Sequence, residues 1–209
     1  MIKVAIVDDH RMVLDGLKQI LSHEPDIEVA GEACNADEGI RCLLKQDIDI
    51  AILDISLPDK SGLDILDIVK TKKPKLRVLI LSAFPEKQYA VRALKSGASG
   101  YLTKNSAPQE LVDAIRRINS GGKYITASLA EKLTDILTSD DKMPHERLSN
   151  REFEIMRMIA AGKTTGEIAE ILFISPSTVG TYRSRIMEKM AMKTNADLTR
   201  YVVENRLNS

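Results

Sequence analysis

The feature that most constrains this chain is an alternation of short apolar runs with amphipathic stretches over roughly its first 120 residues. The apolar runs read KVAIVDD, IEVAGEA, IDIAILD, RVLILSA and SGYLTK, and each is followed by a helical pattern of apolar residues. Nearly continuous apolar runs are typical of strands that are covered on both faces. Five successive strand–helix units therefore predict an α/β domain with a doubly wound parallel sheet.

The remainder of the chain has a different pattern. The run GGKYITASLAEKLTDIL predicts one more helix, and the polar run TSDDKMPHER over residues 138–147 predicts a linker. Four helical patterns without any strand follow, with N-caps expected at Ser149, at Ser175 and, for the last helix, at Asn195. We therefore predict a first domain over residues 1–122, a helix and linker over 123–146, and an all-α four-helix domain over 147–209.

Composition narrows the class of protein without choosing a function. The 30 Lys and Arg residues balance 30 Asp and Glu, so total charge predicts neither nucleic-acid nor membrane binding. Cys34 and Cys42 form no CxxC motif, and the chain has no signal peptide or transmembrane-length apolar run, which predicts free thiols in a cytoplasmic protein. The histidines, His10, His23 and His145, form no cluster, which argues against zinc chemistry.

Polar side chains stand where the predicted strands end. In the run AILDISLPDKSG, Asp54 ends an apolar stretch, although an unpaired buried charge costs several kcal/mol or shifts its pKa. The carboxyl ends of parallel strands meet at one edge of a sheet, and such folds carry their functional sites there. Five residues share this predicted edge: Asp8, Asp9, Asp54, Ser82 and Lys104.

Three converging carboxylates need a cation, and oxygen ligands in this number suit Mg²⁺. Lys104 adds a fixed positive charge and Ser82 adds a hydroxyl donor. The set predicts a cradle for a metal-bound phosphoryl group, with Asp54 as the candidate nucleophile. Taken singly, each residue has a plainer interpretation, since a lone Asp at a strand end is more often a loop cap.

An enzyme with an aspartyl-phosphate intermediate is a competing interpretation of the same residues. Such an enzyme needs a general acid near its nucleophile and usually a cap domain for its substrate. Two residues after Asp54 the chain has Ser56, which is not an acid, and it has no cap insertion. The sequence therefore favours a protein that is no enzyme beyond its own phosphoryl transfer and slow dephosphorylation.

The run GEIAEILFISPSTVGTYRSRIMEKM has the anatomy of a helix-turn-helix. The second helix places an apolar stripe of Val179, Tyr182, Ile186 and Met190 toward a core. Its outward face carries polar residues that can meet a major groove: Ser177, Thr181, Ser184 and Arg185. A generic helical bundle with a solvated polar face fits this stripe equally well.

The motifs IVDDH, AILDISLPDKSG, LSA and GYLTK resemble those of receiver domains in bacterial response regulators, over residues 2 to about 120. The resemblance implies a flavodoxin-like (βα)5 fold and an Asp54 that accepts a phosphoryl group from the phosphohistidine of a sensor histidine kinase. It implies that Mg²⁺ is held by Asp9, Asp54 and the main-chain carbonyl of Ser56, with Asp8 assisting through water. It further implies phosphoryl contacts from Lys104 and a switch formed by Ser82 and Tyr101.

The run from LSNREFEIMRMIAAG to DLTRYVVENRL resembles LuxR-type domains of the NarL/FixJ family, and the GacA/UvrY branch in particular. Many members have Lys where this chain has Gly180 and His where it has Tyr182, which leaves the base preference open. We expect Thr181, Ser184 and Arg185 near bases, together with Ser177 on the same face. Further expected roles are phosphate contacts by Arg183 and Lys189, and dimerisation through Leu198, Tyr201 and Val202.

Together these motifs predict a cytoplasmic two-component response regulator that forms a homodimer on phosphorylation and binds double-stranded DNA. Paired domains holding paired half-sites gain affinity because the second contact is intramolecular. An alternative stays open at this point: a regulator that binds DNA without phosphorylation and uses its receiver only for dimerisation.

Overall fold

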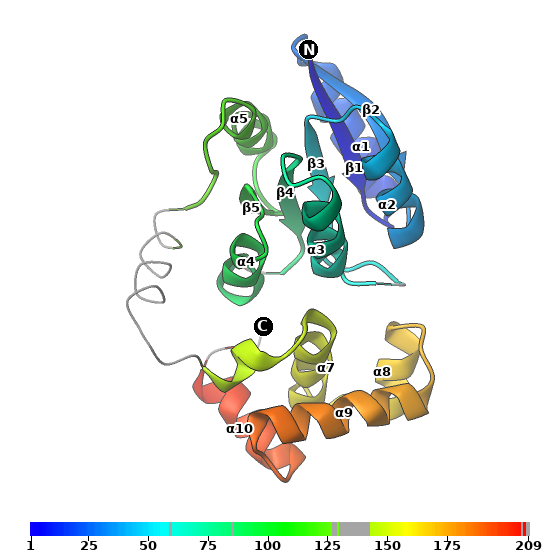
Figure 1. Cartoon of the computed structure of the whole chain (residues 1–209), viewed down its shortest axis with the longest axis vertical. Coiled ribbons are helices and arrows are strands. Elements are labelled where there is room, and N and C mark those ends of the chain that lie inside the picture. Colours follow the sequence, from blue (N-terminus) through cyan, green and yellow to red (C-terminus); the bar gives the residue numbers. More distant parts are fainter. Residues whose placement is uncertain (59, 85, 127–128, 130–142, 206, 208–209) are drawn as a thin grey trace. The chain divides into compact units, whose positions relative to one another are not determined.

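The structure is a computed structural model of the chain, and it describes residues 1–58, 60–84, 86–126, 129, 143–205 and 207. Between residues 132 and 133 the chain divides into two compact units. A five-stranded sheet with its helices forms the first unit, and the described part of the second unit is helical (Figure 1). The predicted helix and linker between residues 123 and 146 lie largely outside the described residues.

One parallel sheet forms the centre of the first unit, with the strand order β2-β1-β3-β4-β5. The strands are β1 (Ile2–Val7), β2 (Ile27–Ala33), β3 (Ile50–Leu53), β4 (Arg77–Ser82) and β5 (Gly100–Thr103). The strand order changes direction next to β1, and the crevice beyond such a point is where doubly wound sheets bind their ligands. The predicted α/β class and parallel sheet are confirmed.

Helices cover both faces of this sheet, which explains the nearly continuous apolar strands. Helices α1 (Arg11–Ser22) and α5 (Pro108–Asn119) share one core cluster, in which Leu17 and Ile115 join Ile6 and Ile52 of the strands. Helices α2 (Ala36–Lys45), α3 (Gly62–Lys72) and α4 (Glu86–Lys95) follow one another as packed neighbours on the opposite face.

Strand register brings the polar strand ends together. Val7 of β1 pairs with Leu53 of β3, so the next residues of these two strands, Asp8 and Asp54, stand side by side. Ser82 at the end of β4 pairs with Thr103 of β5, and Lys104 follows immediately. A slip of one residue would turn these side chains to the other face of the sheet, so the apolar pattern that fixes the register also positions the site.

The described part of the second unit consists of η1 (Pro144–Arg147), α7 (Asn150–Ala160), α8 (Thr165–Ile171), α9 (Pro176–Met190) and α10 (Asn195–Glu204). The predicted caps Ser149 and Ser175 both accept a backbone hydrogen bond at the start of their helices. The prediction of Asn195 as the last cap is wrong by one residue. Thr194 takes this place because Asp197 stands three residues after it and completes a reciprocal capping box.

The core of the second unit contains the predicted stripe of α9. Val179, Ile186 and Met190 are buried, Tyr182 is half-buried, and Phe153 of α7 is buried within the same unit. Across the described part of the chain, no helix combines the length and apolar character that crossing a bilayer requires.

Gly62, at the start of α3, lies against the backbone that carries Asp54, and this contact yields a stability prediction. A Cβ at Gly62 would overlap the carbonyl oxygen of Asp54 and lie 2.9 Å from the Cα of Ile55. Because backbone atoms cannot move aside cheaply, we expect Gly62→Ala to destabilise the first unit by roughly 1–3 kcal/mol or more in urea unfolding.

Gly16 in the middle of α1 provides the matched control for this prediction. No atom lies within 4 Å of a Cβ built at that position. Gly16→Ala should therefore stabilise the unit by roughly 0.5–1 kcal/mol, through helix propensity alone. Equal effects of the two substitutions would contradict the close approach at Gly62.

Candidate functional site

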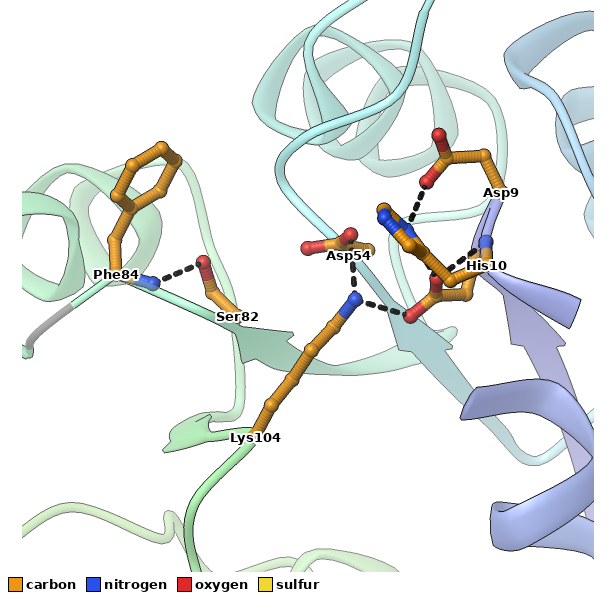
Figure 2. Close-up of polar contacts among 7 residues, drawn as sticks. Asp9, His10, Asp54, Ser82, Phe84 and Lys104 are labelled. Carbon is orange, nitrogen blue, oxygen red and sulfur yellow. Dashed lines mark hydrogen bonds and ion pairs between the residues drawn. The ribbon is translucent and has the colours of Figure 1, made fainter. Parts of the chain in front are cut away.

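The carboxyl edge of the sheet carries a buried acidic pair, Asp8 and Asp54 (Figure 2). Each residue is only 2% exposed, and each follows the last residue of a central strand. The backbone N–H of Asp54 donates to the carbonyl of Val7, so this hydrogen bond to β1 fixes the position of the Asp54 backbone. The structure thus places Asp54, the predicted nucleophile, as a buried residue at the carboxyl edge of the sheet.

Lys104 joins the two buried carboxylates. Its Nζ lies 2.6 Å from Asp8 Oδ2 and 2.8 Å from Asp54 Oδ2 (Figure 2). Burial alone would lower the pKa of Lys104, but the hydrogen bonds to Asp54 and Asp8 outweigh it and raise the pKa above its ordinary value. Lys104 is therefore a fixed positive charge at this edge.

The second oxygen of Asp54 lacks a hydrogen-bond partner in the part of the chain that the structure describes. Asp54 Oδ1 is buried and accepts no hydrogen bond from the described residues. Burial raises the pKa of Asp54 above its ordinary value, Asp8 adds to the rise, and Lys104 and the Ser56 backbone oppose it. A buried acceptor without a partner is costly, and it is an atom that a bound cation or a reacting group can use.

Asp9 and His10 complete the cluster on the solvent side. Ligand atoms of Asp8, Asp9, His10 and Asp54 all lie within 4.8 Å of one another. His10 Nδ1 is 2.7 Å from Asp9 Oδ1, although that oxygen accepts no hydrogen bond with acceptable geometry from the described residues. The three carboxylates offer the hard oxygen donors that Mg²⁺ prefers, so the cluster fits this ion.

His10 was missed by the sequence analysis, which considered the histidines only as a possible group of three. The available signal was its position directly after Asp8 and Asp9 in the run VDDH, at the end of β1. Ser56, by contrast, was named in advance. It lies two residues beyond Asp54 and forms an antiparallel bridge with Ser61, the residue before α3.

Ser82 and Tyr101 meet at one residue, Phe84. The Ser82 hydroxyl, fully buried, accepts a hydrogen bond from the Phe84 backbone N–H at 3.2 Å (Figure 2). The Tyr101 hydroxyl donates to the Phe84 carbonyl at 2.8 Å, and its ring is buried. The two predicted switch residues are therefore linked through the segment between β4 and α4.

The outward face of α9 holds most of the predicted DNA-contacting residues. Ser177, Thr181, Ser184 and Arg185 are exposed. The hydroxyls of Thr181 and Ser184 donate to the carbonyls of Ser177 and Gly180, one turn earlier. Arg185 is exposed and forms no ion pair or hydrogen bond with the described residues, so its guanidinium is accessible on the outward face of α9, as predicted.

The two predicted phosphate contacts of α9 already have partners inside the unit. Lys189 Nζ lies 2.6 Å from Glu152 Oε2, a carboxylate that is only 4% exposed. The Arg183 Nε donates to Asn195 Oδ1 at 2.9 Å. Both side chains therefore hold α9 against neighbouring segments. A contact of either side chain with a DNA phosphate would have to share its N–H donors with Glu152 or Asn195.

The predicted dimer residues of α10 differ in exposure. Leu198 and Val202 are both fully buried and belong to the helix that packs on α7, so both side chains contribute to the core of this unit, and their role in dimerisation stays a prediction. Tyr201 is half-buried, and its hydroxyl lies 2.8 Å from His145 Nδ1 of η1. Val203, 54% exposed, is a large apolar residue that α10 exposes to solvent.

Comparison with protein families agrees with this two-part architecture. Residues 4–116 match the response regulator receiver domain, and residues 146–202 match the bacterial regulatory proteins of the luxR family. The chain is 34% identical over 209 residues to the response regulator UvrY of Escherichia coli (strain K12), covering 99% of this chain and 96% of UvrY. It is 35% identical over 215 residues to the oxygen regulatory protein NreC of Staphylococcus epidermidis (strain ATCC 12228), covering 98% of each.

Solved structures give the same result. A complex of the two-component response regulator RcsB with DNA matches with a TM-score of 0.61 and 27% identity, over 97% of this chain and 98% of the other. RcsB from Salmonella enterica serovar Typhimurium, bound to promoter rprA in the presence of phosphomimetic BeF3−, matches with a TM-score of 0.65 and 26% identity, over 97% and 99%.

The charges at the sheet edge predict that removing a carboxylate and removing the lysine have opposite effects on the free energy of unfolding in metal-free buffer. Asp54→Asn removes one of two buried carboxylates that share Lys104, so we expect stabilisation on the order of 1 kcal/mol at neutral pH. Lys104→Met leaves both carboxylates buried without their cation, so we expect a loss of roughly 3–5 kcal/mol. Urea unfolding measures both.

The stabilisation by Asp54→Asn should depend on pH in a definite direction. The pKa of Asp54 is raised in the folded protein, so the folded state holds its proton at a pH where the unfolded chain has released it. The cost of the carboxylate is therefore present above the raised pKa and disappears as pH falls through it. A gain from Asp54→Asn that grows toward acid pH would contradict this assignment.

Proposed function

The chain belongs to the bacterial two-component response regulators of the NarL/FixJ family, in which a receiver domain precedes a LuxR-type domain, and we propose that it accepts a phosphoryl group on Asp54 and thereby controls transcription. The single observation that carries this proposal is the environment of Asp54. One oxygen is held by Lys104, and the other is buried without a hydrogen-bond partner among the described residues. A buried carboxylate with one oxygen paired and the other unpaired still has an acceptor that a bound cation or a phosphoryl group can engage.

Mg²⁺ fits this site as the cation of the reaction. Asp8, Asp9 and Asp54 would hold it together with the main-chain carbonyl of Ser56, and the buried Asp54 Oδ1 is the donor that most needs a partner. When bound, Mg²⁺ supplies positive charge that offsets the negative charge of the carboxylates and of the phosphoryl oxygens.

The residues of the chain divide the phosphoryl transfer between them. An oxygen of Asp54 attacks the phosphorus of a phosphohistidine on a sensor kinase, an O–P bond forms, and the N–P bond breaks with the electron pair returning to the imidazole. Lys104 stays within reach of Asp54 and pairs with the charge that gathers on the phosphoryl oxygens. Ser82, on the next strand, offers a hydroxyl whose proton is free to turn toward them.

Phosphorylation then biases a two-state element centred on Phe84. The Ser82 hydroxyl accepts from Phe84, so donation to a phosphoryl oxygen draws the segment before α4 toward Asp54. Tyr101 must then move with Phe84 to keep its hydrogen bond to the Phe84 carbonyl, or that hydrogen bond breaks. The charge added at Asp54 is thereby coupled to the packing of Tyr101 on β5. A local change in charge can in this way alter the structure beyond the site.

The second unit supplies the DNA-binding function. Family membership and the solved RcsB–DNA complexes support the assignment of α9 as the helix that enters the major groove of double-stranded DNA. We assign residues 1–122 to the receiver, 123–146 to a helix and linker, and 147–209 to the DNA-binding domain. The regulator acts as a homodimer in the cytoplasm, where its kinase partner and its DNA are both accessible.

The test of the phosphoacceptor is intact mass together with sedimentation, with Mg²⁺ and a small phosphodonor. The wild type should gain the mass of one phosphoryl group and move toward dimer, because charge at Asp54 shifts the receiver equilibrium. Asp54→Asn should do neither. A gain in mass without dimerisation would contradict only the proposal that phosphorylation causes dimerisation. No gain in mass would favour a regulator that binds DNA without phosphorylation.

The assignment of α9 predicts different losses for two of its cationic side chains. On a duplex selected from a randomised pool with the wild type, Arg185→Ala should cost about 1–3 kcal/mol of binding and less on unselected DNA. Lys189→Ala should instead destabilise the folded second unit by roughly 1–3 kcal/mol, because it leaves the buried Glu152 carboxylate without its ion pair.

Binding titrations and thermal unfolding separate the two roles. Arg185→Ala should leave the melting temperature near that of the wild type, since the side chain has no partner among the described residues. Equal losses on selected and unselected DNA would place Arg185 on phosphates and not near bases.

A further inference from the structure

The acidic cluster contains a nitrogen donor that a simple Mg²⁺ site does not need. His10 follows Asp8 and Asp9, the two carboxylates that come after β1, and stands at the N-cap position of α1, yet its side chain makes no capping hydrogen bond. Its imidazole points back toward the carboxylates from the β1–α1 connection (Figure 2). Nδ1 lies 2.7 Å from Asp9 Oδ1 and 3.4 Å from Asp8 Oδ1.

These separations match the spacing of ligands on a single ion. Two ligands at right angles on an octahedral ion, with bonds of about 2.1 Å, stand about 3.0 Å apart. The two distances from His10 Nδ1 to carboxylate oxygens fall on either side of that value. The four residues present one ligand atom each within 4.8 Å of one another, and the buried Asp54 Oδ1 has no partner among the described residues.

We propose that His10 is an additional ligand of this site and that its imidazole nitrogen raises the affinity of the site for Ni²⁺ above what the carboxylates alone provide. Imidazole is a ligand of transition metals, whereas Mg²⁺ prefers oxygen and keeps several waters. At sites of mixed nitrogen and oxygen donors, affinity rises from Mn²⁺ to Ni²⁺. This inference rests on the proposed function only for the location of the Mg²⁺ site.

The experiment is metal binding to the full chain without a histidine tag, by calorimetry with Ni²⁺ and with Mg²⁺. His10→Ala should weaken Ni²⁺ binding at least tenfold, and should change Mg²⁺ binding by no more than about twofold. His23→Ala is the matched control, because His23 is also exposed but its Nδ1 contacts the Gln19 carbonyl at the far end of α1. It should bind both ions as the wild type does.

A spectroscopic readout tests the ligand directly. With Mn²⁺ at the site, the electron spin echo should carry nitrogen modulation from the imidazole, and His10→Ala should lose it while His23→Ala keeps it. The proposal is overturned if His10→Ala retains wild-type Ni²⁺ affinity and nitrogen modulation, or if excess Mg²⁺ fails to displace Ni²⁺ from the wild type.

Phosphorylation of the wild type separates this inference from the proposed function. Its gain of one phosphoryl group with Mg²⁺ and phosphodonor tests the three carboxylates and Lys104, and it does not depend on whether His10 binds a metal ion. If the wild type gains no phosphoryl group, the phosphoacceptor assignment fails, and the role of His10 is still decided by the Ni²⁺ and Mn²⁺ data.

Discussion

The contact between Lys104 and the two buried carboxylates is the interaction on which the rest of this receiver depends. A parallel sheet of five apolar strands buries whatever follows its central strands, and here that is Asp8 and Asp54. One ammonium satisfies one oxygen of each carboxylate and leaves the cluster short of positive charge. That deficit makes the edge attractive to a metal ion, and it costs the metal-free protein stability.

Under the proposed function, the contacts at the same edge offer a route by which a charge added at Asp54 could affect other parts of the receiver. Ser82 and Tyr101 lie on neighbouring strands and both bind Phe84, one through its N–H and the other through its carbonyl. The Phe84 ring also packs on Tyr89 of α4, with centroids 4.9 Å apart. A pull on Ser82 therefore acts on a backbone segment that is tied to both β5 and α4, so the response cannot stay confined to one side chain.

Much of this arrangement could be predicted from the sequence because it follows from strand periodicity. The residue after an apolar run lies at the sheet edge, and this rule found Asp8, Asp54, Ser82 and Lys104. It could not find Phe84, whose role lies in backbone atoms that carry no sequence signal, or His10, whose side chain direction depends on the turn into α1. For Leu198 and Val202 the sequence cannot separate core packing from dimerisation, since a buried stripe and an interface stripe have the same pattern.

The second unit uses its charges differently from the first. In the receiver, unsatisfied charge is concentrated at one buried edge. In the helical unit, Glu152 and Asn195 already engage Lys189 and Arg183. Arg185 is exposed and forms no such contact within the described residues, so its guanidinium can pair with DNA without first breaking an internal bond. Two basic residues of α9 thus stabilise the packing of this helix within its own unit, and under the proposed function the third, Arg185, is available to DNA.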